Sequence, residues 1–304
     1  MAITGVIRVD RREIEISRPE KVLFPDDGIT KGDLIEYYAR IAPRMLPHLR
    51  DRPLTLERYP NGINTKRFFQ KEVSSYFPKW IRTVTVEKVG GTVTHVVCND
   101  TATLVYIANQ ACVTPHIFLS RTDKLEVPDQ LVFDLDPQGD DFEVVKATAV
   151  AFKQLLDELE LPAFLKTTGS RGLHVVVPLK RREPYDGVRA FGRDLAGIIV
   201  SRAPRARTME QLKANRGNRI FIDTNRNGYA QLVAPAYAVR ARKGAPVSVP
   251  LDWSELKKKD LRANSFTIRN VFTRLDRVTD PWADFWDSAV SLAAARRKLG
   301  RLAG

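Results

Sequence analysis

Residues 131–136 read Leu-Val-Phe-Asp-Leu-Asp, an apolar run that carries two carboxylates one residue apart. In a β-strand, side chains two positions apart lie on the same face, so Asp134 and Asp136 project together and Leu135 faces the opposite layer. Pro137 has no amide proton for a sheet ladder, which ends the strand directly after the pair. Neighbouring carboxylates repel each other unless a proton or a cation relieves them. The segment therefore predicts either a solvated strand end or a site for a hard cation such as Mg²⁺ or Mn²⁺.

A third acid strengthens the metal-site interpretation. Asp223 ends another apolar run, Ile-Phe-Ile-Asp, at residues 220–223. Three carboxylates at neighbouring strand ends can hold two divalent ions, an arrangement that serves phosphoryl transfer. The interpretation requires the two strands to lie side by side, which is an expectation about the fold.

The chain between these acids contains a short turn that could bind phosphate. Residues 167–172 read Thr-Thr-Gly-Ser-Arg-Gly and lead into a strand that begins near His174. The glycines permit close backbone approach, the hydroxyls of Thr168 and Ser170 can donate hydrogen bonds, and Arg171 can bind a phosphate oxygen. A polar turn that binds nothing is the alternative interpretation.

Apolar spacing and turn residues organise the first 120 residues as a smaller N-terminal module. Its expected elements, in chain order, are a helix over 31–46 capped by Thr30, a hairpin over 83–98 around Gly90-Gly91, and a helix over 102–111 capped by Asn99 or Asp100.

From residue 131 the pattern alternates between strands and helices. The expected elements are strands at 131–136, 161–168 and 173–179, helices at 142–161 and 185–203, and strands at 219–225 and 229–235 that close the sheet. Residues 251–275 predict a strongly basic appendage, and a last helix over about 282–301 is expected on the surface. The mixture predicts an α+β fold in one domain over 1–304, whose second part begins near residue 121.

The charge of the chain indicates a polyanionic partner. Its 304 residues include 49 Lys and Arg against 36 Asp and Glu, a formal net charge of +13, which favours nucleic acid over a merely basic soluble protein. Residues 180–219 carry eleven Lys and Arg against four acids. We interpret this segment, with Lys213 and Arg216, as a loop that follows a template strand rather than as a solvated helix and loop.

Cysteine content and hydropathy favour a cytoplasmic protein. Two cysteines cannot form a disulfide framework, the first ten residues lack a signal-peptide pattern, and no apolar stretch approaches the ~20 residues of a membrane span. His95, Cys98, Cys112 and His116 imitate the spacing of zinc ligands. We expect no zinc, because buried free cysteines explain both thiols more simply.

Three of these segments resemble one known family when they are taken together. The stretches FDLDP, TTGSRGLH and FIDTN, in this order, are similar to the motifs of the archaeo-eukaryotic primase superfamily. The chain more closely resembles the polymerase domain of bacterial ligase D and its stand-alone archaeal relatives in non-homologous end joining. Further matching segments cover nearly the whole chain, at 20–38, 52–72, 99–116, 234–242 and 266–275.

The resemblance implies a primase-like catalytic core with mixed or antiparallel sheets flanked by helices. It implies a template-directed DNA or RNA nucleotidyltransferase that fills gaps at double-strand breaks, often prefers ribonucleotides, and uses two Mn²⁺ or Mg²⁺ ions with Mn²⁺ favoured. Asp134, Asp136 and Asp223 match the metal-binding carboxylates. The residues that match the grip on the incoming NTP or dNTP are Thr168, Ser170, Arg171, His116 and Arg240, with His174 as the motif histidine.

The N-terminal module matches the part of the family that holds the downstream 5′-phosphate of gapped or broken DNA. Lys21 and Lys31 match the phosphate-binding lysines, and Arg18 replaces a common asparagine nearby. Phe68 and Phe69 match aromatic residues that stack on bases. A Phe-Phe pair by itself is more typical of core packing with at least one buried ring. The further candidates for contact with DNA are Arg58 and Lys71.

The chain departs from the family's pattern in two places. Glu57 stands before Arg58 where a basic pair is common, and Arg226-Asn227 follows the third acid where Gln-Asn is common. No Lys-x-Asp-Gly ligase nucleophile is found in the sequence, so sealing is expected from a separate ligase, with Ku as a further partner.

Two alternatives to a gap-filling polymerase at the nucleoid stay open. A non-catalytic module that binds or bridges 5′-phosphorylated ends would need cations rather than three acids. A primase that starts chains de novo is disfavoured by the missing zinc-binding segment and by the lysines that match a 5′-phosphate pocket.

Overall fold

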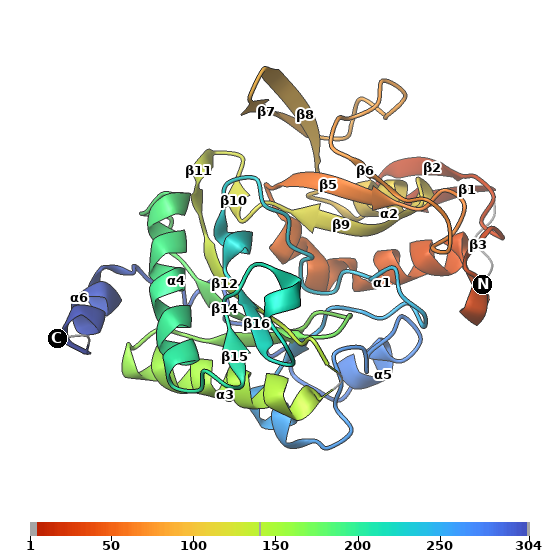
Figure 1. Cartoon of the computed structure of the whole chain (residues 1–304). Helices are drawn as coiled ribbons and strands as arrows, with labels where there is room; N and C mark the ends of the chain where they lie inside the picture. The colour runs from red at the N-terminus through yellow and green to blue at the C-terminus, as the bar shows by residue number, and fades with distance from the viewer. Residues whose placement is uncertain (1–4, 140, 303–304) are drawn as a thin grey trace. The chain divides into compact units, whose positions relative to one another are not determined.

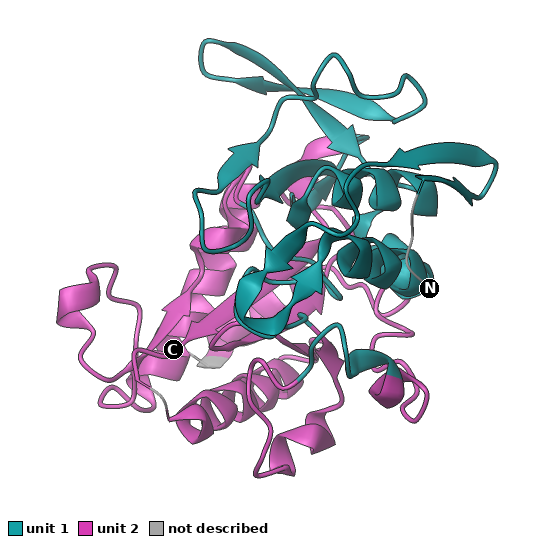
Figure 2. Ribbon diagram, turned by 90° about the vertical axis from the view of Figure 1, so that its right-hand side faces the viewer, with its two compact units in different colours: residues 1–123, 232–248, 266–272 teal, residues 124–231, 249–265, 273–304 magenta. Residues whose placement is uncertain are grey.

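The computed structural model describes residues 5–139 and 141–302, and the chain forms two compact units, distinguished by colour in Figure 2. The first unit comprises Met1–Asp123, Leu232–Ser248 and Phe266–Phe272, and the second comprises the rest. The sheets are antiparallel or mixed and are accompanied by helices, which confirms the expected α+β fold. The long first segment of the first unit ends at Asp123, near the expected boundary. The chain then returns to this unit twice, which the sequence did not predict.

The first unit pairs α1 (Lys31–Leu49) and α2 (Thr101–Asn109) with a five-stranded sheet of order β6-β5-β8-β7, in which β9 also pairs with β5 (Figure 1). Its strands are β1 (Gly5–Val9), β2 (Arg12–Ile16), β3 (Val22–Phe24), β4 (Ile29–Thr30), β5 (Pro53–Arg58), β6 (Phe68–Gln70), β7 (Thr83–Lys88), β8 (Gly91–Val97), β9 (Cys112–Ile117) and β10 (Ser120–Arg121). A 3₁₀ turn, η1 (Pro25–Asp27), joins β3 and β4.

Local signals account for the helices and the hairpin of this unit. The Thr30 side chain accepts from the Asp33 amide while the Asp33 carboxylate accepts from the Thr30 amide, a capping box that begins α1 as expected. Asp100, rather than Asn99, caps α2, which ends two residues before the expected position. Lys88 pairs with Gly91, so the β7–β8 hairpin turns at Val89 and Gly90.

The second unit is built on a six-stranded sheet of order β15-β16-β12-β14-β13-β17, antiparallel except for the β15–β16 pair. Its strands are β11 (Lys124–Pro128), β12 (Gln130–Asp136), β13 (Phe164–Thr167), β14 (Leu173–Pro178), β15 (Arg207–Thr208), β16 (Ile220–Asp223) and β17 (Pro250–Leu251). Its helices are α3 (Phe142–Glu158), α4 (Tyr185–Ser201) and α6 (Ala293–Leu302), with 3₁₀ turns η2 (Lys213–Asn215), η3 (Asn225–Asn227) and η4 (Trp253–Lys257). Helix α5 (Val271–Leu275) begins in the first unit and ends in the second.

Helices α3 and α4 cover one face of this sheet. Phe133 on β12 packs against Phe152 on α3 with ring centroids 4.3 Å apart. A Cβ atom placed on Gly192 of α4 would lie 2.8 Å from a methyl of Leu131. The odd-numbered residues of β12 therefore face the helices, and its even-numbered residues, Asp134 and Asp136 among them, lie on the opposite face.

Three expectations for the C-terminal half are wrong. Residues 229–235 form no strand; Val233 makes one isolated bridge to Ile117, and β15 and β17 are the edge strands instead. Residues 251–275 are not an appendage, because β17 pairs with β13 and 266–272 belong to the first unit. Only α6 is helical within 282–301. Trp282 and Phe285 before it are buried, and the Trp282 indole donates to the Leu165 carbonyl at 3.0 Å.

Among the described residues, no helix combines the length and the apolar character that a membrane crossing requires.

A buried asparagine fixes η3 against β12. The Asn227 amide oxygen accepts from the Val132 amide at 2.7 Å, and its amide nitrogen donates to the carbonyls of Val132 at 2.7 Å and Thr224 at 3.0 Å. Its side chain is fully buried. The backbone of η3 and the middle of β12 are thereby held as one piece.

Asn227→Ala should lower the free energy of unfolding by about 1–3 kcal/mol, because it leaves buried backbone groups of Val132 without partners. Chemical denaturation followed by circular dichroism measures the change. Asn218→Ala, at an exposed position of the same unit, is the matched control and should be neutral. Equal stability of the two variants would contradict the role of Asn227.

Candidate functional site

Four polar side chains form a row across the sheet of the second unit. Asp134 on β12 pairs with His174 on β14 on one side and with Asp223 on β16 on the other, and His174 pairs with Lys166 on β13. Directly paired residues of antiparallel strands lie on the same face. The row therefore lies on the face opposite α3 and α4, with Asp136 two residues further along β12 on that same face. The expectation that the two acidic strand ends are adjacent holds in the structure.

Arginine side chains accompany each of the three carboxylates. Arg226 Nε lies 3.5 Å from Oδ2 of Asp134 and 3.5 Å from Oδ2 of Asp223. Arg171 Nη2 lies 3.1 and 3.3 Å from the two oxygens of Asp136. The acids that the sequence singled out are thus gathered around cationic groups of the same unit.

Burial and mutual repulsion set the protonation of the row. Burial, and then the charge of Asp134, raises the pKa of both Asp136 and Asp223 above the usual value. Burial alone would also raise the pKa of Asp134, but the hydrogen bond from His174 and the charges of Arg226 and Lys166 lower it. Burial, followed by the charge of Lys166, lowers the pKa of His174 to about 4. At neutral pH the imidazole is therefore neutral and its Nε2–H, 3.3 Å from Asp134, can donate to the carboxylate.

The turn between β13 and β14 packs directly on β12. A Cβ atom on Gly172 would lie 1.9 Å from the Leu135 carbonyl oxygen, and Gly169 has a φ of 65°, so both positions require glycine. The Thr168 hydroxyl accepts from the amides of Ser170 and Gly172 and donates to the Gly172 carbonyl. Thr168 therefore shapes the turn, and Ser170 and Arg171 are the side chains at its tip.

The donor set fits a hard divalent cation, because carboxylate oxygens converge on one face of the sheet. Within residues 5–139 and 141–302, however, no three His, Cys, Asp or Glu side chains already meet as a ligand set. The carboxylates contact guanidinium groups instead, so a metal ion would have to replace those contacts.

The first unit holds two residues that the sequence assigned to the nucleotide, His116 and Arg240. His116 Nε2 lies 2.9 Å from Oε2 of Glu57, whose other oxygen accepts from Tyr59 at 2.9 Å and from Arg67 at 3.0 Å. Burial would raise the pKa of Glu57, but these partners and the charge of Arg240 lower it to about 2. Glu57, a departure from the family's pattern, is thus an ionised residue that fixes the His116 ring.

Aromatic and basic side chains line an open groove of about 780 Å³ in the first unit. The Phe68 and Phe69 rings are 43% and 44% exposed, so core packing of the pair is ruled out. Arg58 lies 5.1 Å from the Phe68 ring centroid and bonds to Gln110, Gln70 and Tyr76, while Phe69 lies 5.8 Å from the His116 ring. Residues that also line this groove include Lys71, Tyr76 and Lys88.

Three cationic residues gather at the start of α1. The Lys31 amide donates to the Lys21 carbonyl at 2.8 Å, and the Lys21 amide donates to the Arg18 carbonyl at 3.2 Å. Lys21 Nζ bonds to Asn61 at 3.0 Å and Lys31 Nζ to Ser17 at 3.0 Å. Burial, and then the charge of Arg18, lowers the pKa of Lys31 to about 8. This is a partly dehydrated cluster of like charges next to a helix N-terminus.

The basic segment before β16 folds back on itself. Arg216 donates to the carbonyls of Glu210 and Gln211, and its guanidinium carbon lies 3.6 Å from the Phe221 ring centroid. Lys213 is exposed on η2. The charge of Arg216 reaches Asp136 and Asp223.

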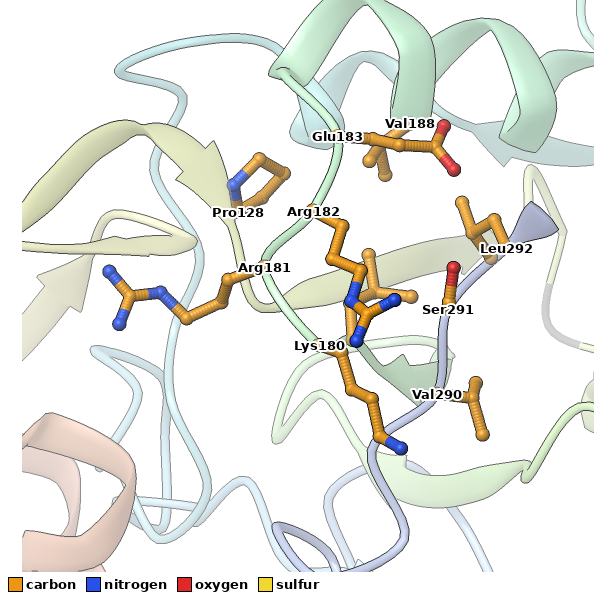
Figure 3. Close-up of a pocket in the computed structure, with 10 residues that line it drawn as sticks. Pro128, Lys180, Arg181, Arg182, Glu183, Val188, Val290, Ser291 and Leu292 are labelled. Carbon is orange, nitrogen blue, oxygen red and sulfur yellow. The ribbon is translucent and has the colours of Figure 1, made fainter.

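Figure 3 shows a further basic region, a cavity of about 10 Å³ where the loop after β14 meets the chain before α6. The Lys180 amide donates to the Val290 carbonyl at 2.9 Å, and the Arg181 side chain points away from Val290 and Ser291. The cavity has room for about one water molecule and is lined by none of the three carboxylates. We therefore interpret this cavity as a small packing gap and not as a binding site.

Sequence reasoning missed Lys166 and left Arg226 without a role. Lys166 is buried in β13, and its charge lowers the pKa of both Asp134 and His174. A lysine inside an apolar strand, two residues before the turn, was the available signal. The position of Arg226 could be read only from the pairing of β12 with β16.

Asp134→Asn and Asp223→Asn should change stability in opposite directions at pH 7 in the presence of a chelator. The lowered pKa of Asp134 means that its ionised form stabilises the fold, whereas the raised pKa of Asp223 means that ionisation costs stability. Each pKa unit corresponds to about 1.4 kcal/mol. Thermal denaturation measures both variants. The effect of Asp134→Asn should shrink as the pH falls below the usual carboxyl value of 3.8, whereas the effect of Asp223→Asn should shrink above that value, as the pH falls through the raised pKa of Asp223. A loss of stability in Asp223→Asn equal to that in Asp134→Asn would refute this account.

The chain is similar to known proteins over most of its length. The family model of the LigD primase-polymerase domain matches residues 30–282. The multifunctional non-homologous end joining protein LigD of Pseudomonas aeruginosa is 34% identical over 305 residues, covering 99% of this chain and 36% of that protein. The bifunctional protein LigD of Bacillus subtilis is 29% identical, covering 90% of this chain and 44% of that protein. The chain thus spans less than half the length of these curated relatives.

The fold comparison agrees with the family comparison. The polymerase domain of Mycobacterium tuberculosis ligase D, solved in complex with DNA, superposes with a TM-score of 0.85 at 29% identity, covering 91% of this chain and 99% of that one. The family model, the relatives and the shared fold agree, and this chain belongs to the LigD primase-polymerase domain family.

Proposed function

We propose that this protein is a template-directed nucleotidyltransferase that fills gaps at double-strand breaks during non-homologous end joining, with NTPs preferred over dNTPs. The observation that carries the proposal is the direct pairing of Asp134 with Asp223, next to Asp136 on the same face of the sheet. The family's polymerase domains and the DNA-bound neighbour support it. Action on nucleoid DNA in the cytoplasm, with a separate ligase and Ku, belongs to the same proposal.

Asp134, Asp136 and Asp223 are the residues that would hold two divalent ions, Mn²⁺ or Mg²⁺. When bound, such ions supply Lewis acidity for the attack of a primer 3′-hydroxyl on the α-phosphorus and neutralise charge on the leaving pyrophosphate. Neutral His174 orients the Asp134 carboxylate, and the charge of Lys166, the strand partner of His174, favours the ionised form of that carboxylate. Both act by fixing one charge state of the site before substrate arrives.

Residues of each unit are assigned a role in binding the triphosphate. Ser170 and Arg171 stand on the rigid turn of the second unit, where Thr168 shapes the backbone. His116 and Arg240 belong to the first unit, where Glu57 fixes the imidazole. Guanidinium and backbone donors suit phosphate oxygens at both places.

The cluster of Arg18, Lys21 and Lys31 is the proposed binding place for the downstream 5′-phosphate. Ammonium groups suit a compact phosphate, and exposed Phe68 and Phe69 suit stacking on any base. Further contacts with DNA are assigned to Arg58 and Lys71 in the groove and to Lys213 and Arg216 in the basic segment. Arg58 and Arg216 already bond within the protein, so they would act through charge and stacking.

A purely DNA-binding module accounts less well for the acids. Binding of phosphate requires cations, and three crowded carboxylates, two of them with a raised pKa, oppose it unless divalent ions are bound. The proposal is tested by primer extension on a gapped, 5′-phosphorylated duplex, with each nucleotide type in Mn²⁺ and in Mg²⁺.

Asp136→Asn should reduce primer extension at least about a hundredfold, because it removes a ligand of the ions that stabilise the transition state. Binding of the gapped duplex, followed by fluorescence anisotropy, should be nearly unchanged. Asp194→Asn, at an exposed position of α4, is the control with full activity. Undiminished synthesis by Asp136→Asn would exclude the metal role of this residue.

Lys31→Met should remove the preference for a 5′-phosphate over a 5′-hydroxyl at the gap and should stabilise the DNA-free protein at pH 7. The stabilisation follows because a lysine whose pKa is lowered by burial costs stability while it is charged. In the natural protein the preference should weaken as the pH rises above about 8, with phosphate binding moving the transition upward. Binding titrations with both DNA ends measure the preference, and Lys79→Met is the control. An equal loss of affinity for both ends would argue against a phosphate pocket.

A further inference from the structure

Arg226 occupies the space between two carboxylates that the proposed function assigns to metal ions. Its Nε lies at the same distance, 3.5 Å, from Oδ2 of Asp134 and Oδ2 of Asp223. The residue sits on η3, immediately after β16, and η3 is fixed by Asn227 and by the Asn225 amide, which donates to Oδ1 of Asp223 at 2.8 Å. The fixed backbone of η3 therefore places the Arg226 guanidinium beside the two acids.

The contact of Arg226 with the two carboxylates is weak enough to be exchanged for another ligand. A charge-assisted hydrogen bond between nitrogen and oxygen is usually about 2.7–2.9 Å long, so 3.5 Å indicates charge neutralisation without a tight bidentate pair. The Arg226 side chain is 41% exposed. Arg216 in the same unit differs, because its guanidinium donates to two carbonyls and lies over Phe221. Arg226 can leave its position without breaking a buried network.

A divalent ion and this guanidinium cannot share the same oxygens. An ion that uses Oδ2 of both acids needs ligand distances near 2.0–2.6 Å, inside the volume that Arg226 now fills. Resting on the proposed metal role of the three acids, we infer that Arg226 is an internal competitor for the catalytic ions: it neutralises Asp134 and Asp223 in the metal-free protein and must swing out before a metal ion is held.

Competition of this kind lowers the apparent metal affinity by the fraction of molecules in which the site is open. It also keeps the acids neutralised, and so protects the sheet, while no ion is bound. Arg226 thereby raises the metal concentration at which the site fills. It is a positioning residue that holds Asp134 and Asp223 until a metal ion takes its place.

The test measures Mn²⁺ binding directly, without DNA or nucleotide, from the loss of the free-ion signal in electron paramagnetic resonance. Arg226→Gln should bind Mn²⁺ about tenfold more tightly than the natural protein, because the competitor's charge is gone. Arg226→Met, which keeps length without charge, should do the same and serves if the glutamine variant folds poorly. Arg202→Gln, which removes an exposed arginine paired with Glu158, should leave Mn²⁺ affinity unchanged, and Asp134→Asn should weaken it.

A second readout separates competition from a general effect on folding. In chelator, Arg226→Gln should melt at a lower temperature than the natural protein, and saturating Mn²⁺ should produce a larger upward shift in the variant. Equal or weaker Mn²⁺ affinity in both Arg226 variants, with Asp134→Asn still impaired, overturns the inference and leaves the proposed function standing. Absence of Mn²⁺ binding in every protein, the natural one included, overturns the metal assignment itself.

Discussion

The pairing of Asp134 with Asp223 across β12 and β16 is the constraint on which the rest of the second unit depends. Like charges directly opposite each other in a sheet are destabilising. The surrounding residues offset the repulsion: His174 can donate to Asp134, Lys166 continues the row, and Arg226 lies between the two acids. A local rule of sheet formation is broken here and compensated nearby, which is typical of functional sites.

Rigidity of the backbone keeps this compensated arrangement in place. Asn227 ties η3 to Val132, and Gly172 brings the turn of Ser170 and Arg171 against the Leu135 carbonyl, where no other residue fits. The acidic strand, the donor turn and the arginine-bearing turn are therefore one assembly. The backbone around the acids is thus held in place by contacts within the protein, which is the condition for a preorganised site.

The sequence predicted those features that short-range physics determines. The caps and periodicity of α1 and α2 are local, and the alternation Asp134–Leu135–Asp136 defines a face without knowledge of the neighbouring strands. Residues 229–235 were predicted as a strand, but they make one bridge to Ile117, a contact that depends on tertiary packing. The helix expected over 282–301 begins only at Ala293 for the same reason, since Trp282 is held by a carbonyl of β13.

The same distinction applies to the functional side chains. Some can be recognised from neighbouring residues in the sequence, and others only from their partners in the fold. The three acids and the turn could be found because chemistry and motif coincide within a few residues. The roles of Glu57 and Arg226 could not, because each depends on a partner across the sheet, His116 for one and Asp134 for the other. Both residues depart from the family's pattern, and both are placed beside a residue that matches it.

The two proposed phosphate-binding places differ in how their cations are neutralised, and this difference bears on the order of binding. Lys21 and Lys31 bond to neutral acceptors, Asn61 and Ser17, so an incoming phosphate meets cations that need no exchange. Arg171 and Arg226 contact carboxylates, so ligands at the acidic site must first displace an internal ion pair. Under the proposed roles, recognition of the DNA end therefore requires less rearrangement than assembly of the metal and nucleotide site. A repair enzyme built this way would engage a broken end before it commits a metal ion and a nucleotide to chemistry.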